Sequence, residues 1–212
     1  MNWADNESMT CFDENPRFRQ VPDTMFKRDQ IHETLSCEGE DKFENIGNNS
    51  QLIQNYPAIQ KYNVVSVFDV ACYVLYQIKQ CTTMKLQKLL YYCQAWYLVW
   101  NDKPLFRENI EAWANGPVVR ELYNFHKGLF NIDESMMSLG NPNHLSKEQK
   151  DDIDSVLKAY KDKSSQWLID QTHSERPWRD ARRGMQPNER GHKIITHAAM
   201  AEYYSSLYEQ EK

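Results

Sequence analysis

The amino-acid sequence predicts a mainly α fold, namely a compact multi-helix domain with a small β-hairpin, preceded by an acidic and largely irregular N-terminal extension. Two observations support this prediction. Apolar residues recur at helical spacing in several segments after residue 60, whereas residues 1–60 show no sustained periodicity. We therefore divide the 212 residues into an extension, 1–60, and a helical domain, 61–212.

The extension is acidic and polar. It contains 11 Asp and Glu against 5 Lys and Arg, a net charge of −6, while residues 61–212 contain 19 and 20. Pro16, Pro22 and Pro57 interrupt it. Such a composition predicts a segment that is disordered or folds only on binding. Four apolar residues within it are candidate partner contacts: Phe12, Phe18, Met25 and Phe26.

Composition also narrows the class of partner and the compartment. Neither part has the strongly basic balance typical of DNA-binding domains, so nucleic acid is not expected to be the principal partner. The first ten residues lack a basic segment followed by an apolar run, and no later run reaches roughly 18 apolar residues. We expect a cytoplasmic protein without membrane contact. The five cysteines include no CxxC pair, which favours free thiols.

Two consecutive helices are predicted after Ser66. Apolar residues of the first follow one helical face: Val67, Val70, Ala71, Val74, Leu75 and Ile78. Thr82 or Thr83 can cap the second helix, which is expected to end near Asn101. A second apolar area lies almost opposite the main stripe of this helix, so we expect it to be covered on two sides. The main stripe consists of Leu86, Leu89, Leu90, Cys93, Trp96, Tyr97 and Trp100.

The second helix, which contains TMKLQKLLYYCQAW, also carries four polar side chains among its apolar ones: Lys85, Gln87, Lys88 and Gln94. Burying an amide or ammonium group without a partner is costly, so each needs a hydrogen-bond partner or water. Two explanations stay open. In the first, the aliphatic part of each lysine is buried while its ammonium group reaches water, and the glutamines form hydrogen bonds with neighbouring loops. In the second, residues 85–94 form part of a partner-binding surface.

The next segment contains PLFRENIEAWANGPVV, in which two short runs favour β structure. We expect a small hairpin around Arg107, Glu108 and Asn109.

Pro117 fits the first position of a helix, where its missing N–H group costs nothing. A third helix is therefore expected from Pro117 to about Lys127, ending at Gly128. With Gly116 as its N-cap, the next N–H groups would lack a side-chain acceptor from the cap. Either Asn115, another side chain or water satisfies them, or an acidic group of a partner protein or of the extension binds at this helix start.

Three more elements are predicted near the C-terminus. SKEQ, residues 146–149, is a capping box ahead of a helix, and another helix is expected around Trp167 to Thr172. THSERPWRDARRGMQPNERG is polar and interrupted by proline and glycine, so we predict an ordered loop there. KII is expected to be extended, before a final helix from about Thr196 to Tyr208. Four residues of that helix are expected in the core, with partner contact as the alternative: Tyr203, Tyr204, Leu207 and Tyr208.

Within THSERPW, His173, Glu175 and Arg176 lie close in sequence, but no nucleophile elbow, Walker loop or HExxH motif accompanies them. We expect no enzymatic activity, no bound metal and no cofactor. Trp178 is expected to anchor the segment on the core, with His173 and Glu175 in structural hydrogen bonds. The basic residues nearby are expected to be solvated, and contacts to phosphate, RNA, the extension or a partner protein are the alternatives: Arg176, Arg179, Arg182, Arg183, Arg190 and Lys193.

Three motifs in this order, TMKLQKLLYYCQAW, PLFRENIEAWANGPVV and THSERPW, resemble the Panacea domain, also called the SocA-like or phage-associated GepA-type antitoxin domain. The resemblance covers residues 64–208 and leaves the extension outside. It implies an antitoxin of a toxin–antitoxin system, often carried by phages or prophages, that neutralises its toxin by direct binding. Toxins paired with the family include alarmone synthetases and other translation inhibitors. A proteolytic adaptor that delivers a toxin to a cellular protease, or a phage-encoded protein that counters host defence, is the alternative.

These arguments together predict a non-enzymatic, cytoplasmic antitoxin whose partner is a toxin protein, with the extension as a candidate specificity element. The candidate partner-binding residues are Phe12, Phe18, Met25, Phe26, Lys85, Gln87, Lys88, Gln94, Asn115, Gly116, Pro117, Arg176, Trp178 and Arg179.

Overall fold

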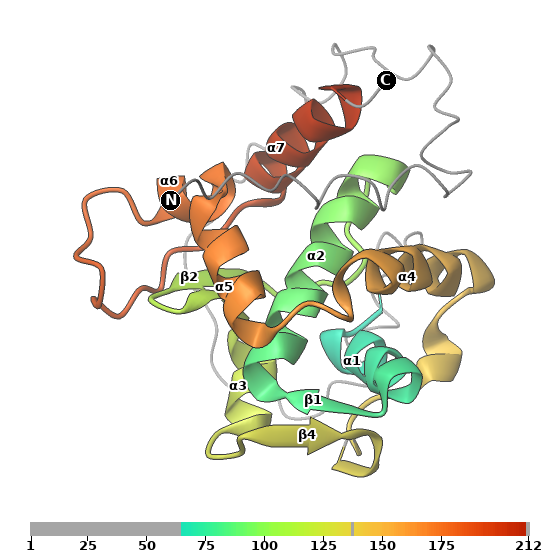
Figure 1. Ribbon diagram of the computed structural model, residues 1–212. Coiled ribbons are helices and arrows are strands. Elements are labelled where there is room, and N and C mark those ends of the chain that lie inside the picture. Colours follow the sequence, from blue (N-terminus) through green and yellow to red (C-terminus); the bar gives the residue numbers. More distant parts are fainter. Residues whose placement is uncertain (1–64, 137, 211–212) are drawn as a thin grey trace, which may run out of the picture. The chain divides into compact units, whose positions relative to one another are not determined.

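The computed structural model describes residues 65–136 and 138–210 (Figure 1). The predicted mainly α fold is confirmed for this part, in which helices dominate and two small antiparallel sheets join them. The helices are α1 (Val67–Ile78), α2 (Thr83–Asn101), α3 (Arg120–His126), α4 (Lys147–Tyr160), α5 (Ser165–Ser174), α6 (Arg176–Ala181) and α7 (His197–Gln210), with short 3-10 turns η3 (Glu134–Met136) and η4 (Pro142–His144). The strands are β1 (Gln80–Thr82), β2 (Ile110–Trp113), β3 (Gly116–Val119) and β4 (Asn131–Asp133). The predictions for Phe12, Phe18, Met25 and Phe26 lie outside the described residues.

Helix α2 is the core element of the described part. It packs against α1, α4, α5, α7 and strand β3 (Figure 1). Every residue from Leu86 to Leu98 is buried, so the predicted coverage on two sides is confirmed and extends around the whole helix. Thr82 is the N-cap, and its side chain accepts a hydrogen bond from the Lys85 N–H group. Because polar residues within this span are buried too, each must find its partner inside the protein.

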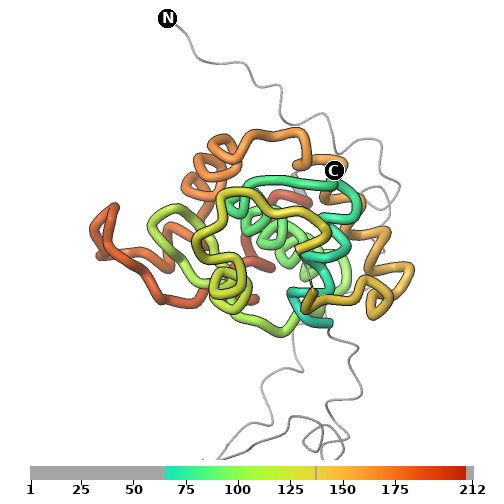
Figure 2. Tube along the Cα trace, turned by 90° about the horizontal axis from the view of Figure 1, so that it is seen from below, coloured from blue at the N-terminus to red at the C-terminus, as the bar shows by residue number. Residues whose placement is uncertain are grey.

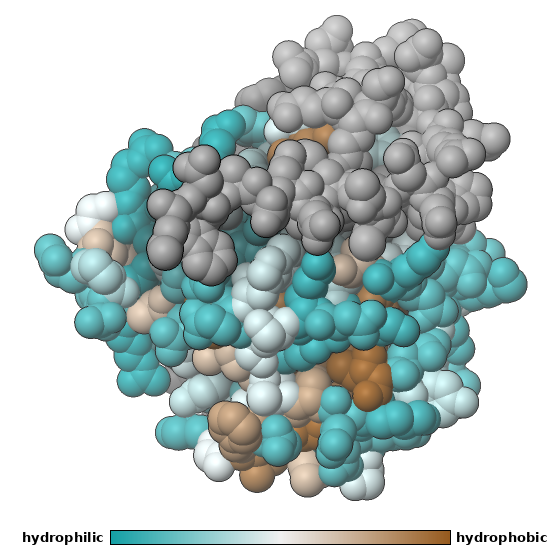
Figure 3. All heavy atoms as spheres, in the orientation of Figure 1, coloured by the Kyte–Doolittle hydropathy of each residue, from teal (hydrophilic) through white to brown (hydrophobic). Residues whose placement is uncertain are grey.

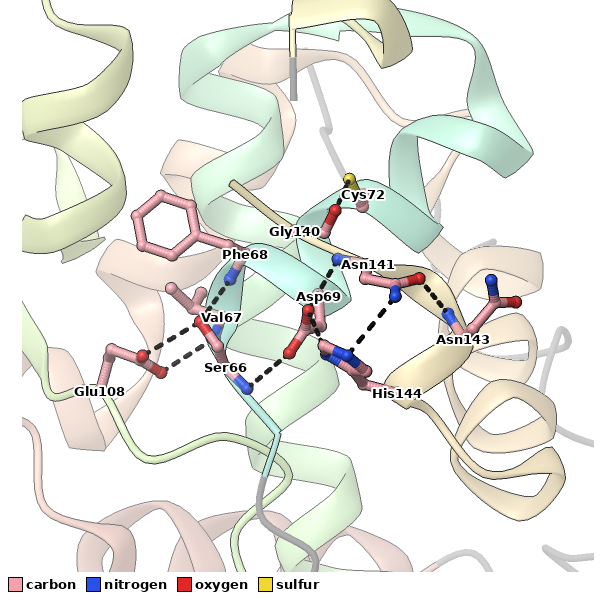
Figure 4. A network of polar contacts seen from close by, with 10 residues as sticks. All are labelled: Ser66, Val67, Phe68, Asp69, Cys72, Glu108, Gly140, Asn141, Asn143 and His144. Atoms are coloured by element: carbon pink, nitrogen blue, oxygen red, sulfur yellow. Dashed lines mark hydrogen bonds and ion pairs between the residues drawn. The ribbon is translucent and has the colours of Figure 1, made fainter. Parts of the chain in front are cut away.

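Two carboxylates meet the first turn of α1 (Figure 4). Ser66 and Asp69 form a capping box, with the Ser66 N–H group 3.1 Å from Asp69 Oδ2. Glu108, from the segment before β2, accepts from the Val67 N–H group at 2.9 Å and from the Ser66 hydroxyl at 3.3 Å. Negative groups at a helix N-terminus satisfy its free donors and its dipole. Glu108 therefore ties the segment before the hairpin to α1.

The loop before α4 crosses the start of α1 at very close range. Asp69 Oδ1 accepts from the Asn141 N–H group at 2.7 Å and lies 3.1 Å from Nδ1 of His144 (Figure 4). Gly140 passes so near the α1 backbone that a Cβ atom on it would lie 2.1 Å from the Phe68 carbonyl oxygen. Glycine is required at such an approach because any side chain would collide with main-chain atoms.

The predicted hairpin exists, but the predicted position around Arg107, Glu108 and Asn109 is wrong. Strands β2 and β3 pair from Ile110 with Val119 to Trp113 with Gly116, so the turn lies at residues 114–115. The predicted helix start at Pro117 is wrong for the same reason, since GPVV forms β3 and α3 begins at Arg120.

Further along the chain, local signals predicted most elements well. The capping box at Ser146 and Gln149 opens α4, and α5 and α7 occupy the predicted regions. The predicted extended run KII forms an isolated bridge from Ile194 to Glu111. The predicted loop after Thr172 is wrong in its first half, because Pro177 lies in the first turn of the short helix α6. Strands β1 and β4 were not predicted, since three residues carry too little pattern.

Two general expectations can be compared with the described residues. Cys81 and Cys93 are free thiols, and burial raises the pKa of Cys81 to about 11. No helix within residues 65–136 and 138–210 is long and apolar enough to cross a bilayer.

On the face in Figure 3, apolar residues show over the lower part, where α1, β1 and β4 lie. Two exposed apolar side chains near this end are Leu129 and Phe130, with exposed fractions of 45% and 77%.

Candidate partner-binding cleft

The backbone of the hairpin is held from one side by two polar residues of α2. Gln87 bonds both polar groups of Val119: its Oε1 accepts from the N–H group at 2.8 Å, and its Nε2 donates to the carbonyl at 3.3 Å. Lys88 is completely buried, and its Nζ donates to the Pro117 carbonyl at 3.0 Å. Gly116, with φ +99°, passes directly over the Lys88 stem, where a Cβ atom would lie 2.5 Å from Cε.

Residues of α5 and α6 hold the other side of the hairpin. Trp178 Nε1 donates to the Trp113 carbonyl at 2.9 Å, and Arg182 Nη1 donates to the Ala112 carbonyl at 3.0 Å. His173 stacks on Trp178, with ring centroids 4.0 Å apart, and forms a hydrogen bond with the Ala114 backbone. The predicted anchoring role of Trp178 is thus confirmed. We call this set of side chains the hairpin clamp: Gln87, Lys88, His173, Trp178 and Arg182.

Gln94 repeats this arrangement two turns further along α2. Its Oε1 accepts from the N–H groups of Leu105 and Phe106 at 3.0 and 3.1 Å, and its Nε2 donates to the Phe106 carbonyl at 3.0 Å. Its Nε2 also lies 2.9 Å from Nε2 of His197, as that of Gln87 lies 3.0 Å from Nε2 of His126. Because each amide nitrogen is a donor, the facing ring nitrogen must accept.

Both histidines are therefore neutral in this arrangement. Burial lowers the pKa of His126 and of His197, in agreement with the tautomer that the hydrogen bonds require.

The polar residues of α2 thus have structural roles. The explanation in which the glutamines bond neighbouring segments is confirmed for Gln87 and Gln94. The expectation that the lysine stems reach water is wrong for Lys88, and Lys85 donates to the Lys161 carbonyl. Gln87, Lys88 and Gln94 are all buried and form no exposed partner-binding surface, although Gln87 reaches the lining of the cleft described next.

In front of the clamped hairpin lies a cleft of about 340 Å³. It is bounded by the start of α2, the hairpin turn, α3 and the loop after α6. In Figures 1 and 2 that loop runs beside the hairpin. None of the described residues that line the cleft is Asp or Glu. They are Thr83, Met84, Gln87, Trp113, Ala114, Asn115, Val118, Tyr123, His126, Lys127, Gly128, Leu129, Asn188 and Arg190.

Aromatic side chains form one wall of the cleft. The rings of Trp113 and Tyr123 meet edge to face with centroids 4.6 Å apart. The guanidinium groups of Arg120 and Arg190 lie over the Trp113 ring at 5.8 and 5.7 Å. Both distances are within the range of cation–π attraction.

Arg120 and Arg190 differ in whether a carboxylate neutralises their charge. Arg120 binds Glu111 through two hydrogen bonds of 2.7 Å. Burial alone would raise the pKa of Glu111, but hydrogen bonds from Arg120 and Trp113 outweigh it and lower the pKa. Arg190 and Lys127 make no ion pair within the described part of the chain. The open face of the cleft therefore carries two uncompensated positive charges.

The candidate partner-binding residues of the hairpin lie in two different environments. Asn115 is exposed at the hairpin turn and lines the cleft, whereas Gly116 and Pro117 are buried in β3. The anion site proposed for a helix start at Pro117 is wrong, since the segment is a strand and Gln87 binds the Val119 N–H group.

The basic residues of α6 lie apart from the cleft lining. Arg176 is exposed and lies 3.5 Å from Glu202 on α7, and Arg179 is exposed and donates to the Ser174 carbonyl. The five aromatic or basic residues of the cleft lining were not among the candidate partner-binding residues, although Arg190 had been considered within the basic stretch. Their only signal was the density of aromatic and basic residues in three separate segments: Trp113, Tyr123, His126, Lys127 and Arg190.

Glu175 joins three helices behind the hairpin clamp. It is 2% exposed and accepts hydrogen bonds from the hydroxyls of Tyr204 at 2.6 Å and Tyr92 at 3.1 Å. Its predicted structural hydrogen bonding is confirmed. Burial raises the pKa of Glu175 to about 7, although the tyrosine hydrogen bonds act in the opposite direction.

We expect Glu175→Gln to stabilise the protein at pH 8 and to have little effect near pH 4.5. A carboxyl group with a raised folded-state pKa contributes stability below its unfolded pKa and loses it as the pH rises through about 7. At about 1.4 kcal/mol per pKa unit, the gain at pH 8 is on the order of 2–3 kcal/mol. Urea unfolding at both pH values, with exposed Glu121→Gln as the control, measures it. An equal effect at both pH values would contradict the buried, titrating carboxyl group.

We also expect Lys88→Met to stabilise the protein more at pH 6 than at pH 9. Burial lowers the pKa of Lys88 to about 7, so the cost of its burial is present in full at pH 6 and disappears as the pH rises toward the unfolded value. Methionine fills a similar volume and removes this pH-dependent cost, but it leaves the Pro117 carbonyl without its donor, which offsets about 1–3 kcal/mol of the gain at both pH values. Half-buried Lys85→Met is the control, and urea unfolding at the two pH values is the measurement.

Comparison with known proteins gives one result. No curated protein and no solved structure matches the chain. Residues 86–179 match the family described as antitoxin SocA-like, Panacea domain, which confirms the resemblance for just under half of the chain. The match runs from α2 to α6 and includes the hairpin and all of the hairpin clamp except Arg182. Residues 86–179 are therefore similar to the Panacea domain of SocA-like antitoxins.

Proposed function

We propose that this chain is a non-enzymatic antitoxin that acts in the cytoplasm and neutralises a cognate toxin by binding it directly through the cleft. The observation that carries the proposal is the cleft itself, a concave surface with aromatic walls and two uncompensated cations. Aromatic residues and arginine are enriched where proteins bind one another. The family match supports a toxin as the partner in general.

The residues around the cleft support a role in protein binding rather than in catalysis. Leu129 lines the cleft, and the next residue, Phe130, is 77% exposed, so apolar surface continues beyond it. The titratable residues of THSERPW are engaged in the fold, since His173 bonds the hairpin backbone and Glu175 is buried between Tyr92 and Tyr204. This engagement supports the proposal that the protein makes and breaks no covalent bonds.

The test is co-expression with the product of the adjacent gene. We expect that product to arrest growth alone, and growth to resume with this chain. Trp113→Ala combined with Arg190→Glu should abolish both rescue and co-purification. The exposed pair Arg183→Glu and Lys193→Glu should leave both intact. Full rescue by the cleft variant, in amounts equal to the parent protein, would place toxin binding elsewhere.

The same assay separates direct inhibition from delivery to a protease. Direct inhibition predicts rescue in cells that lack the ATP-dependent proteases, with the toxin level unchanged. A proteolytic adaptor predicts that rescue and loss of the toxin both require the protease.

The acidic extension is proposed as a specificity element for a toxin that handles nucleotides or tRNA, such as an alarmone synthetase or a translation inhibitor. Such a toxin has a basic active site, and a segment of net charge −6 would be attracted there and oppose substrate entry. Deletion of residues 1–60 should then weaken neutralisation and complex affinity. Unchanged neutralisation and affinity would rule this role out.

A further inference from the structure

We infer that the cleft binds an acidic segment of the partner protein that carries an aromatic side chain. This inference rests on the proposed function for the biological identity of the partner, while its binding chemistry follows from the cleft. Two features define that chemistry, namely the balance of charge at the opening and the aromatic wall inside.

The charge balance selects for an anionic segment. Lys127, at the end of α3, and Arg190, in the loop after α6, are both exposed and lie on different elements of the cleft. Neither makes an ion pair within residues 65–136 and 138–210. Arg120, which lies over the same Trp113 ring, is paired with Glu111 and adds no free charge. Carboxylates entering the cleft would meet two cations and no opposing carboxylate among the described lining residues.

The interior selects for an aromatic anchor. Trp113 and Tyr123 present ring edges and faces, and Met84 and Val118 add apolar surface. A volume of about 340 Å³ is at the small end of ligand-sized pockets, so it holds one large side chain with some backbone. Aromatic rings that pack edge to face attract one another beyond the effect of the buried area.

The wall that would receive this anchor is held in place in advance. The hairpin clamp bonds the carbonyls of Ala112, Trp113 and Pro117 and both polar groups of Val119. Side chains buried behind the hairpin therefore position Trp113 before any partner arrives. A preformed site avoids part of the entropy that ordering a loop on binding would cost.

The surface beside the cleft favours a polypeptide over a small anion such as a nucleotide. Leu129 is 45% exposed at the edge of the cleft, and Phe130 is exposed next to it. A nucleotide confined to about 340 Å³ would leave these side chains in water. A chain that continues past the cleft would cover them, as apolar surface beside a pocket commonly is in protein interfaces.

The experiment uses the full chain and a labelled heptapeptide, Gly-Glu-Asp-Phe-Glu-Asp-Gly, in fluorescence anisotropy at low salt. We expect saturable binding that weakens about tenfold when the acids are replaced by Gln and Asn, and about tenfold when Phe is replaced by Ala. Lys127→Glu with Arg190→Glu should also weaken it at least about tenfold. The matched pair Arg183→Glu and Lys193→Glu should keep the affinity within about twofold.

Other outcomes would overturn the inference. Equal binding of the acidic and amide peptides would exclude the charge selection, and insensitivity to Lys127→Glu with Arg190→Glu would place the peptide elsewhere. Displacement of the peptide by adenosine monophosphate at similar concentration would make the cleft a small-anion site. If the peptide binds as expected but the cleft variants still neutralise the toxin, the proposed function fails at this site and the peptide specificity stands. If the variants lose neutralisation but the peptide does not bind, only this inference fails.

Discussion

Replacing Gln94 with leucine is expected to lower the free energy of unfolding by about 3–5 kcal/mol. The side chain is fully buried and satisfies two N–H groups and one carbonyl of residues 105–106. Leucine fills a similar volume but leaves these main-chain groups and the accepting nitrogen of His197 without partners. Each buried orphan costs about 1–3 kcal/mol, and water cannot reach the site without local opening.

Urea unfolding followed by circular dichroism measures this loss. Exposed Gln166→Leu on α5 is the matched control, because the same chemical change on a solvated face should shift stability by no more than about 0.5 kcal/mol. A Gln94→Leu protein as stable as the parent would show that the segment around Phe106 does not depend on these bonds.

Replacing Gly140 with alanine is expected to cost about 3 kcal/mol or more. The new Cβ atom would lie 2.1 Å from the Phe68 carbonyl oxygen and 3.0 Å from the Asp69 nitrogen, and both atoms belong to the first turn of α1. Because these neighbours are main-chain atoms, no rotamer change can relieve the contact. The loop and α1 must separate, which would weaken the bonds from Asn141 and His144 to Asp69.

Gly128→Ala is the informative control for this prediction. Gly128 has a φ of +90° but nothing within 4 Å of its added Cβ atom, so alanine there meets backbone strain of only about 1–2 kcal/mol. Thermal unfolding of the two variants separates close approach from conformational strain. Equal losses in both variants would argue against the tight crossing at Gly140.

Elements that are specified by signals within a few residues were predicted correctly from the sequence, whereas elements that depend on contacts between distant segments were not. The apolar stripe after Ser66 and the capping box at Ser146 are short-range signals, and from them sequence reasoning located α1 and α4 correctly. Pro177 lies in the first turn of a helix, although a loop was predicted there. Pro117, which was predicted to begin a helix, lies in strand β3. At Pro117, strand pairing and the bonds from Lys88 and Gln87 outweigh a local preference.

The candidate site was harder to predict because it is assembled from distant segments. The motifs that carry the family resemblance build the hairpin and hold it from behind, and several of their polar residues are buried, among them Gln87, Lys88, Gln94 and Glu175. The exposed side of the hairpin meets Tyr123 and Lys127 of the next helix and Arg190 of a loop more than sixty residues later in the chain. Only tertiary packing brings these side chains together, and no spacing rule in the sequence encodes that contact.

The hairpin clamp also has a consequence for the order of folding. Its members extend from Gln87 on α2 to Arg182 after α6, so the hairpin gains its bonds only once both helices have docked. We expect the complete clamp to form after the rate-limiting step, because closing a chain segment that runs from α2 to Arg182 carries a large entropic cost. Weakening the clamp should then accelerate unfolding while leaving the refolding rate nearly unchanged. The lifetime of the binding-competent hairpin is therefore governed by a kinetic barrier to which residues buried far from any partner contribute.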